Sequence, residues 1–422
     1  MTADPTYDHI VIGAGPIGAA TARHLAERGD SVLVIGPEEP AGFADHQGTW
    51  AGHYDQGRMC HVLEIPVVTG MLTTRSIRRF PELTRRTGVE FTTGVECLSV
   101  NPADAAGDAA GEWFDRDVLA ANARDLGVDV HLLDEEGLRR RYPAVRFEPG
   151  HVGVVQPGGM IVNPRALVRA ELAAASAAGA VLVRDEVVAL EGGAGGGDDS
   201  GDDDDNNDDN NHNDDDKVVV TAGGVRLRGR SIVLALGAAV NASGLLPRPL
   251  QLFTLGATVV LVEVDDPGGI DLPATMYLKH RDGAQQFGGV VMSPVRYPDG
   301  RWYLKVAGSS VRETPLGSAE EIASWVRTGG ASADVDDALA VLTDLLPGVR
   351  LGRAHTRPCL VCATSTNHPY IDRVDDRTVL AVEGERGVMA ADEIGRLTAD
   401  LAATGRWTDP LPRDVFRARW AA

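Results

Sequence analysis

The chain has 422 residues, of which 43% are hydrophobic and 24% charged, an ordinary composition for a globular protein. Its net charge is −21, with eleven aspartates between Asp198 and Asp216, which argues against nucleic acid or an anionic membrane as a partner. The first residues lack the basic region of a signal peptide, and no stretch approaches the ~20 apolar residues of a membrane helix. We therefore expect a cytoplasmic protein with free thiols, either a monomer or a small homo-oligomer.

The chain starts with a predicted strand–helix–strand unit, in which apolar strands at 10–12 and 32–35 flank a helical stretch. The turn after the first strand carries glycines in G-x-G-x-x-G spacing, at Gly13, Gly15 and Gly18. In this context the first glycine makes a tight turn, the second lets the backbone approach a pyrophosphate, and the third lets helix and strand pack closely. Because the helix N-terminus also offers N–H groups to phosphates, the sequence predicts a dinucleotide site here.

The second strand lacks the acidic residue that normally holds the adenosine ribose. Gly36 stands in its place, and Glu38 and Glu39 follow as possible substitutes. No lysine or arginine follows directly, which disfavours the 2′-phosphate of NADP at this site.

Further along the chain, helical and extended segments alternate up to residue 250, and long alternating strands follow. Helices are expected at 74–86, 115–125, 134–141, 166–178, 319–327, 335–346 and 391–403. Strands are expected at 181–190, 230–237, 258–264, 285–294, 302–308 and 378–383. The strands beyond residue 250 have the pattern of an antiparallel sheet.

Residues 192–216 consist almost entirely of glycine, aspartate and asparagine. Such a segment buries too little apolar surface to offset its ordering entropy, so we expect a disordered acidic insert. Its aspartates lack the spacing of a calcium-binding loop. Cys359 and Cys362 form one C-x-x-C pair, and a zinc site would need a second, so no metal is expected.

The order of these elements resembles the D-amino-acid oxidase superfamily of FAD enzymes, and within it the monomeric sarcosine oxidase and N-methyltryptophan oxidase branch. The shared features are the N-terminal unit, the helix after Asn163-Pro-Arg, the turn at Leu236-Gly237 and the glycine-rich strand–helix near the C-terminus. The resemblance implies an α/β fold in which a Rossmann-like FAD-binding domain of the glutathione reductase type is interleaved with an antiparallel-sheet substrate domain. The implied FAD-binding domain comprises 5–84, 151–246 and 355–422, and the substrate domain 85–150 and 247–354. The implied FAD-binding residues are Gly13, Gly15, Pro16, Ile17, Gly18, Glu38, Arg58, Val187, Gly237, Gly384, Gly387, Val388 and Met389.

Three local matches support the branch. Cys359, thirteen residues before Asp372, is similar to the family cysteine that is bonded to the flavin 8-methyl carbon. Lys305 is similar to the lysine whose ammonium lies by flavin N5 and assists oxygen reduction, where a fixed positive charge lowers the barrier. Arg58 is similar to an arginine near the flavin ring. Lys305 could instead be a surface lysine, and Cys359 a small buried side chain or a redox thiol.

The substrate-binding positions depart from the family. The family lysine that binds the substrate carboxylate is replaced by Ala391, and the second arginine of its Arg-x-x-Arg pair by His61. Arg357, before a proline, resembles the carboxylate-binding arginine of the glycine oxidase and D-amino-acid oxidase branches, but it could instead be a structural or surface arginine. Arg386 is a second candidate. Tyr277 could line the pocket or pack in the core. His61 could tune the flavin, act as a base, or do neither.

The resemblance implies an FAD-dependent oxidase of a secondary amine or amino-acid-like C–N bond. Hydride passes to flavin N5, and oxygen then gives hydrogen peroxide. One alternative is a flavin-dependent dehydrogenase or tailoring oxidase of specialised metabolism, acting on a substrate without a free α-carboxylate. The other is a non-catalytic flavin-binding subunit.

Overall fold

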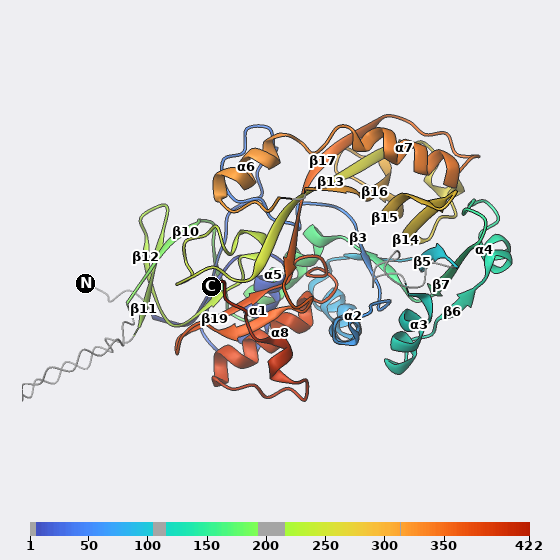
Figure 1. Ribbon diagram of the computed structural model, residues 1–422. Coiled ribbons are helices and arrows are strands. Elements are labelled where there is room, and N and C mark those ends of the chain that lie inside the picture. Colours follow the sequence, from blue (N-terminus) through green and yellow to red (C-terminus); the bar gives the residue numbers. More distant parts are fainter. Residues whose placement is uncertain (1–5, 104–114, 193–215, 313) are drawn as a thin grey trace, which may run out of the picture.

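The computed structural model describes residues 6–103, 115–192, 216–312 and 314–422 (Figure 1). The predicted acidic insert therefore lies almost wholly outside the described residues. Among those residues, no helix is long and apolar enough to cross a membrane.

The first sheet has a parallel centre, as the N-terminal strand–helix–strand unit requires. Its order is β10-β11-β12-β1-β2-β9, with β19 joined to β12 and β18 to β19. Strands β9, β2, β1, β12 and β19 run parallel, and the remaining pairs are antiparallel. Their bounds are β1 Thr6–Ile12, β2 Val32–Ile35, β9 Val181–Val183, β10 Val187–Glu191, β11 Lys217–Thr221, β12 Arg226–Leu234, β18 Tyr370–Arg373 and β19 Thr378–Val382.

Four helices pack together beside this sheet: α1 Pro16–Glu27, α2 Val67–Thr87, α5 Pro164–Ala177 and α8 Ala391–Thr404. Helix α1 lies close against α8, because a Cβ on Gly395 would stand only 2.6 Å from the Cβ of Ala20. Arg23 of α1 joins the helices through Glu171 of α5 at 2.5 Å and Asp392 of α8 at 2.8 Å. All three side chains are buried, so the ion pairs are shielded from solvent.

The second sheet is antiparallel apart from the β5–β14 pair, and its order is β17-β13-β16-β15-β14-β5-β7-β6. Its strands are β5 Cys97–Pro102, β6 His131–Leu133, β7 His151–Gln156, β13 Leu252–Val264, β14 Ala274–Arg281, β15 Ala284–Arg296, β16 Trp302–Val311 and β17 Ala354–Thr364. The shorter helices are α3 Arg116–Asp125, α4 Glu135–Arg141, α6 Ala319–Arg327 and α7 Asp334–Leu345. Helix α7 covers the core of this sheet with Ala338, Val341, Leu342 and Leu345. A third, small sheet has the order β3-β8-β4, from β3 Arg58–Cys60, β8 Met160–Val162 and β4 Thr92–Gly94.

Strands β13 and β17 connect the two halves of the molecule (Figure 1). At one end, Leu252 and Cys362 pack in the core of the first sheet with Ile12. Towards the other end, Val260 and Val262 belong to the core of the second sheet. The middle of this strand pair therefore lies between the two cores.

The predicted α/β architecture, with a Rossmann-like part and an antiparallel sheet, is confirmed. The predicted boundaries assign residues 151–156 and 355–364 to the FAD-binding domain. In the structure these residues form β7 and most of β17, which pair within the antiparallel sheet. The expected helix at 74–86 begins earlier, at Val67, and includes Pro81.

Candidate active site

The glycine turn after β1 has the close contacts that its spacing predicts. Gly13 has a φ of +108°, and a Cβ there would stand 2.2 Å from the Ala235 carbonyl oxygen. A Cβ on Gly18 would stand 1.8 Å from the Gly13 carbonyl oxygen. Gly15 is the N-cap of α1, and no side chain caps that helix end. Pro16 and Ile17 form its first turn, so the end of α1 keeps backbone N–H groups for a pyrophosphate.

Packing explains why the second strand ends without an acidic residue. A Cβ on Gly36 would stand 2.7 Å from both the nitrogen and the Cβ of Ala14, so a side chain does not fit there. Glu39 accepts a hydrogen bond from Arg165 Nε at 2.8 Å. Glu38 is exposed and forms no ion pair within the described residues, so its carboxylate is free to accept from ribose hydroxyls.

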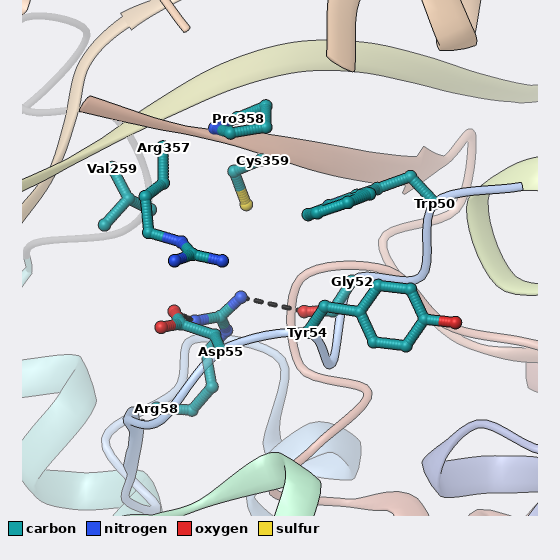
Figure 2. A pocket seen from close by; sticks show the side chains of 9 residues that line it. All are labelled: Trp50, Gly52, Tyr54, Asp55, Arg58, Val259, Arg357, Pro358 and Cys359. Carbon is teal, nitrogen blue, oxygen red and sulfur yellow. Dashed lines mark hydrogen bonds and ion pairs between the residues drawn. The ribbon is translucent and has the colours of Figure 1, made fainter. Parts of the chain in front are cut away.

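A pocket lies between the loop before β3 and the β13–β17 pair (Figure 2). It is lined by Trp50, Gly52, Tyr54, Asp55, Arg58, Val259, Arg357, Pro358 and Cys359. Arg357 and Cys359 are two residues apart on β17, so their side chains leave the same face of the strand. The guanidinium groups of Arg357 and Arg58 face each other, and the Cys359 sulfur points into the same space (Figure 2).

The guanidinium of Arg357 differs from the other cations around this pocket because it has no hydrogen-bond or ion-pair partner in the part of the chain that the structure describes. Burial lowers the pKa of the Arg357 guanidinium below its ordinary value. A half-buried guanidinium with all its donors unused is suited to a carboxylate, which it can bind through two parallel hydrogen bonds.

Lys305 lies beneath the pocket on β16, with only 3% of its surface exposed. This burial excludes the alternative of a surface lysine. Its Nζ donates to Asp55 Oδ2 at 2.7 Å and to the Gly57 carbonyl oxygen at 2.7 Å. Burial and the charge of Arg58 lower the pKa of Lys305, while the adjoining carboxylate favours the ammonium form.

Asp55 also binds two other side chains of the site. Arg58 Nη1 donates to Asp55 Oδ2, and Arg58 Nη2 donates to the Gly52 carbonyl oxygen at 2.8 Å. The Tyr297 hydroxyl donates to Asp55 Oδ1 at 2.5 Å. Asp55 was not among the residues predicted from the sequence, in which its only local signal is its position three residues before Arg58.

Arg386 and His61 form a separate cluster that does not line the pocket. Arg386 Nε donates to Glu64 Oε2 at 2.7 Å, and its Nη1 donates to Glu385 Oε2 at 2.8 Å. Burial and the charge of Arg386 lower the pKa of His61 to about 3, and burial raises the pKa of Glu64 to about 7. His61 is therefore neutral, and its buried Nδ1 has no hydrogen-bond partner within the described ranges.

The remaining predicted positions are spread over the two halves. Tyr277 packs in the core of the second sheet, 1% exposed, with its ring centroid 5.7 Å from that of Phe147. Its buried position agrees with the core-packing alternative. Val187 begins β10, and Gly237 follows β12. The C-terminal positions precede α8 and are Gly384, Gly387, Val388 and Met389. A Cβ on Gly384 would stand 1.7 Å from the Cys362 carbonyl oxygen, so this turn packs directly against β17.

The profile of the FAD dependent oxidoreductase family (DAO) matches residues 8–401, which is most of the chain. The chain belongs to this family. The expected superfamily is thereby confirmed. The uncapped end of α1 and the close contacts of its glycine turn suit the dinucleotide part of FAD.

Two curated relatives match parts of this chain. Monomeric sarcosine oxidase from Streptomyces avermitilis is 32% identical over 182 residues, covering 43% of this chain and 44% of the relative. Peroxisomal sarcosine oxidase from Mus musculus is 27% identical over 162 residues, 38% of each chain. The matched segments thus span less than half the length of these relatives.

A solved structure matches nearly the whole chain. NikD in its open form, described as an unusual amino acid oxidase essential for nikkomycin biosynthesis, has a TM-score of 0.73 and 21% sequence identity. The match covers 99% of this chain and 98% of NikD, which establishes the shared fold.

Proposed function

We propose that the protein oxidises the C–N bond of a secondary amine or amino acid that carries a carboxylate, with oxygen as the acceptor. The observation that carries the proposal is the pocket in which Arg357, without a partner, lies near Arg58, Cys359 and the buried Lys305. In balanced form, the amine and oxygen give an imine and hydrogen peroxide, and water hydrolyses the imine to a carbonyl compound and an amine.

The family cofactor supplies the two-electron acceptor for this oxidation. In this proposal the glycine turn and the end of α1 bind its pyrophosphate, Glu38 binds its ribose, and Cys359 is bonded to its ring system. Arg357 binds the substrate carboxylate and thereby orients the C–N bond. Lys305 supplies a fixed positive charge where oxygen is reduced.

The free guanidinium of Arg357 also bears on the alternative of a substrate without an α-carboxylate. The carboxylate-binding cations are absent at Ala391 and His61, and Arg386 is held by Glu64 and Glu385. Arg357, however, supplies an unused cation in the pocket itself. We therefore favour a carboxylate-bearing substrate over an amine without one.

The test is to mix the FAD-loaded protein, without oxygen, with amines matched in pairs that differ only by an α-carboxylate. We expect the carboxylated member to bleach the flavin absorbance, and air to restore it with one hydrogen peroxide per turnover. Bleaching by the uncarboxylated member alone would favour the tailoring alternative, and no bleaching by any amine would contradict the proposal. On acid precipitation, the yellow colour should stay in the pellet for the wild type and leave it for Cys359→Ala.

A further inference from the structure

The Asp55 carboxylate lies at the centre of the polar contacts beneath the pocket. It is 5% exposed, and both of its oxygens are used. Oδ1 accepts from the Tyr297 hydroxyl, and Oδ2 accepts from Lys305 and Arg58. Three side chains from three parts of the chain therefore converge on one buried carboxylate: Arg58 on β3, Tyr297 after β15 and Lys305 on β16.

Positive side chains outnumber negative ones among the described residues around the pocket. Three cations, Lys305, Arg58 and Arg357, face a single carboxylate among the described side chains that line or underlie the pocket. A buried ammonium is costly unless a countercharge lies within hydrogen-bond distance. Asp55 supplies that countercharge, and no second carboxylate is seen to bind Lys305 in the described structure. Without Asp55, loss of the Lys305 proton is the least costly way to relieve the repulsion among the three cations.

The position of the ammonium depends on the same carboxylate. The aliphatic chain of Lys305 leaves β16 opposite Leu261 of β13 and Met292 of β15, which are both buried. Within the described residues, the Lys305 ammonium donates only to Asp55 and to the Gly57 carbonyl oxygen, and both residues belong to the loop that ends at Arg58. This loop therefore fixes where the positive charge lies.

We infer that Asp55 is a positioning residue of the reaction, which holds Lys305 as an ammonium beneath the pocket and fixes Arg58 and Tyr297 around it. The inference rests on the proposed function, because it assigns the means by which Lys305 keeps the charge that oxygen reduction uses. The groups facing Lys305 are Asp55 and Arg58 from the loop and β3, and Arg357 and Cys359 from β17. Tyr297 reaches it through Asp55.

The composition of the chain allows a direct test, because it contains only three lysines: Lys217, Lys279 and Lys305. FAD-loaded protein carrying ¹³C at lysine Cε gives three side-chain NMR signals, and Lys305→Met identifies the signal of Lys305. In the wild type we expect this signal to be that of an ammonium at neutral pH. In Asp55→Asn, which keeps the size and one acceptor oxygen, we expect Lys305 to titrate at lower pH.

The same variants give a kinetic measurement. Reduced FAD passes two electrons and two protons to oxygen, and stopped-flow absorbance follows the return of oxidised FAD. In Asp55→Asn the reoxidation rate should fall about tenfold or more at alkaline pH and recover as the pH is lowered and Lys305 regains its proton. Asp299→Asn is the matched control, because exposed Asp299 also accepts from a tyrosine hydroxyl, that of Tyr303, at 2.6 Å, but binds no lysine. It should leave both the Lys305 signal and the pH profile unchanged.

The outcomes separate the inference from the proposed function. A wild-type Lys305 signal of a neutral amine at pH 7, or the same titration in wild type and Asp55→Asn, would overturn the role of Asp55. The wild-type measurement holds even if Asp55→Asn does not fold. Reoxidation of Lys305→Met at the wild-type rate would instead overturn the role of Lys305 in the proposed function, whatever the NMR titration of Asp55→Asn shows.

Discussion

Two buried lysines of the antiparallel sheet lie in clusters that differ in net charge: an outer cluster around Lys279 and an inner cluster around Lys305. Lys279, on β14, is 4% exposed, and its Nζ lies 2.5 Å from Asp344 Oδ2 and 3.5 Å from Glu148 Oε1. Arg281 binds the same two carboxylates, so two cations meet two anions in this outer cluster. In the inner cluster, among the described side chains, the single carboxylate of Asp55 pairs with Lys305 and Arg58, and Arg357 is a third cation without a partner. The charges of the outer cluster therefore cancel, whereas the inner cluster has an excess of positive charge that can bind an anion.

Access to solvent also separates the clusters. The Asp344 side chain is 40% exposed and that of Asp55 is 7% exposed, so water screens the outer pairs far more than the inner ones. Burial and a lysine–aspartate pair therefore do not by themselves mark a functional residue. The unbalanced charge beside a pocket distinguishes Lys305 from Lys279.

Removal of each lysine charge gives the largest expected contrast. Lys305→Met should slow flavin reoxidation about 100-fold, because a fixed positive charge near the developing superoxide is lost. Lys279→Met should leave reoxidation within about twofold, since no residue of its cluster lines the pocket. Stopped-flow reoxidation at several oxygen concentrations measures both. Equal slowing in both variants would show that the difference between the clusters has no bearing on catalysis.

The second largest contrast is expected between Arg357 of the inner cluster and Arg281 of the outer cluster. Arg357→Gln should raise KM for a carboxylated amine about 10- to 100-fold with a smaller change in kcat, because a charged hydrogen-bond pair to the substrate is lost. Arg281→Gln, which breaks the outer ion pairs, should leave KM unchanged. Steady-state peroxide assays with the matched amine pairs check this. An unchanged KM in Arg357→Gln would assign the carboxylate to another residue.

The smallest expected effect is a change in the free energy of unfolding when the outer cluster loses one carboxylate. Hydrogen bonds from Lys279 and Arg281 lower the pKa of Asp344 below its ordinary value of 3.8. The ion pairs of Asp344 therefore contribute to stability above pH 3.8, and this contribution is lost as the pH falls through the lowered pKa of Asp344. Asp344→Asn should reduce the free energy of unfolding by about 0.2–1 kcal/mol at pH 7, and the difference should shrink in acid and in high salt. Urea unfolding at pH 7 and pH 3 measures it, and a difference that grows in acid would contradict the assignment.

The sequence predicted the fold and several pocket residues because these carry local signals. The glycine spacing predicts the turn after β1. Lys305, Arg357 and Cys359 were predicted because their local segments resemble the D-amino-acid oxidase superfamily, whereas the strand that carries Arg357 and Cys359 was not predicted. Asp55 has only the weak signal of its position before Arg58, since its partner Lys305 is 250 residues away and the contact exists only once the loop before β3 packs against the second sheet. Tyr277 was ambiguous for a related reason. Alternation along a strand separates two faces, but which face meets the pocket depends on the packing of the whole sheet.

The β13–β17 pair has a consequence for the modular engineering of this protein. Both strands contribute side chains to the cores of both halves, so neither half can be excised at a linker without losing part of its own interior. A chimaera that takes its substrate half from a relative would have to import this strand pair as well. Because Arg357 and Cys359 lie on it, such a graft transfers the proposed substrate anchor and flavin attachment point together, and the two are inherited as one module.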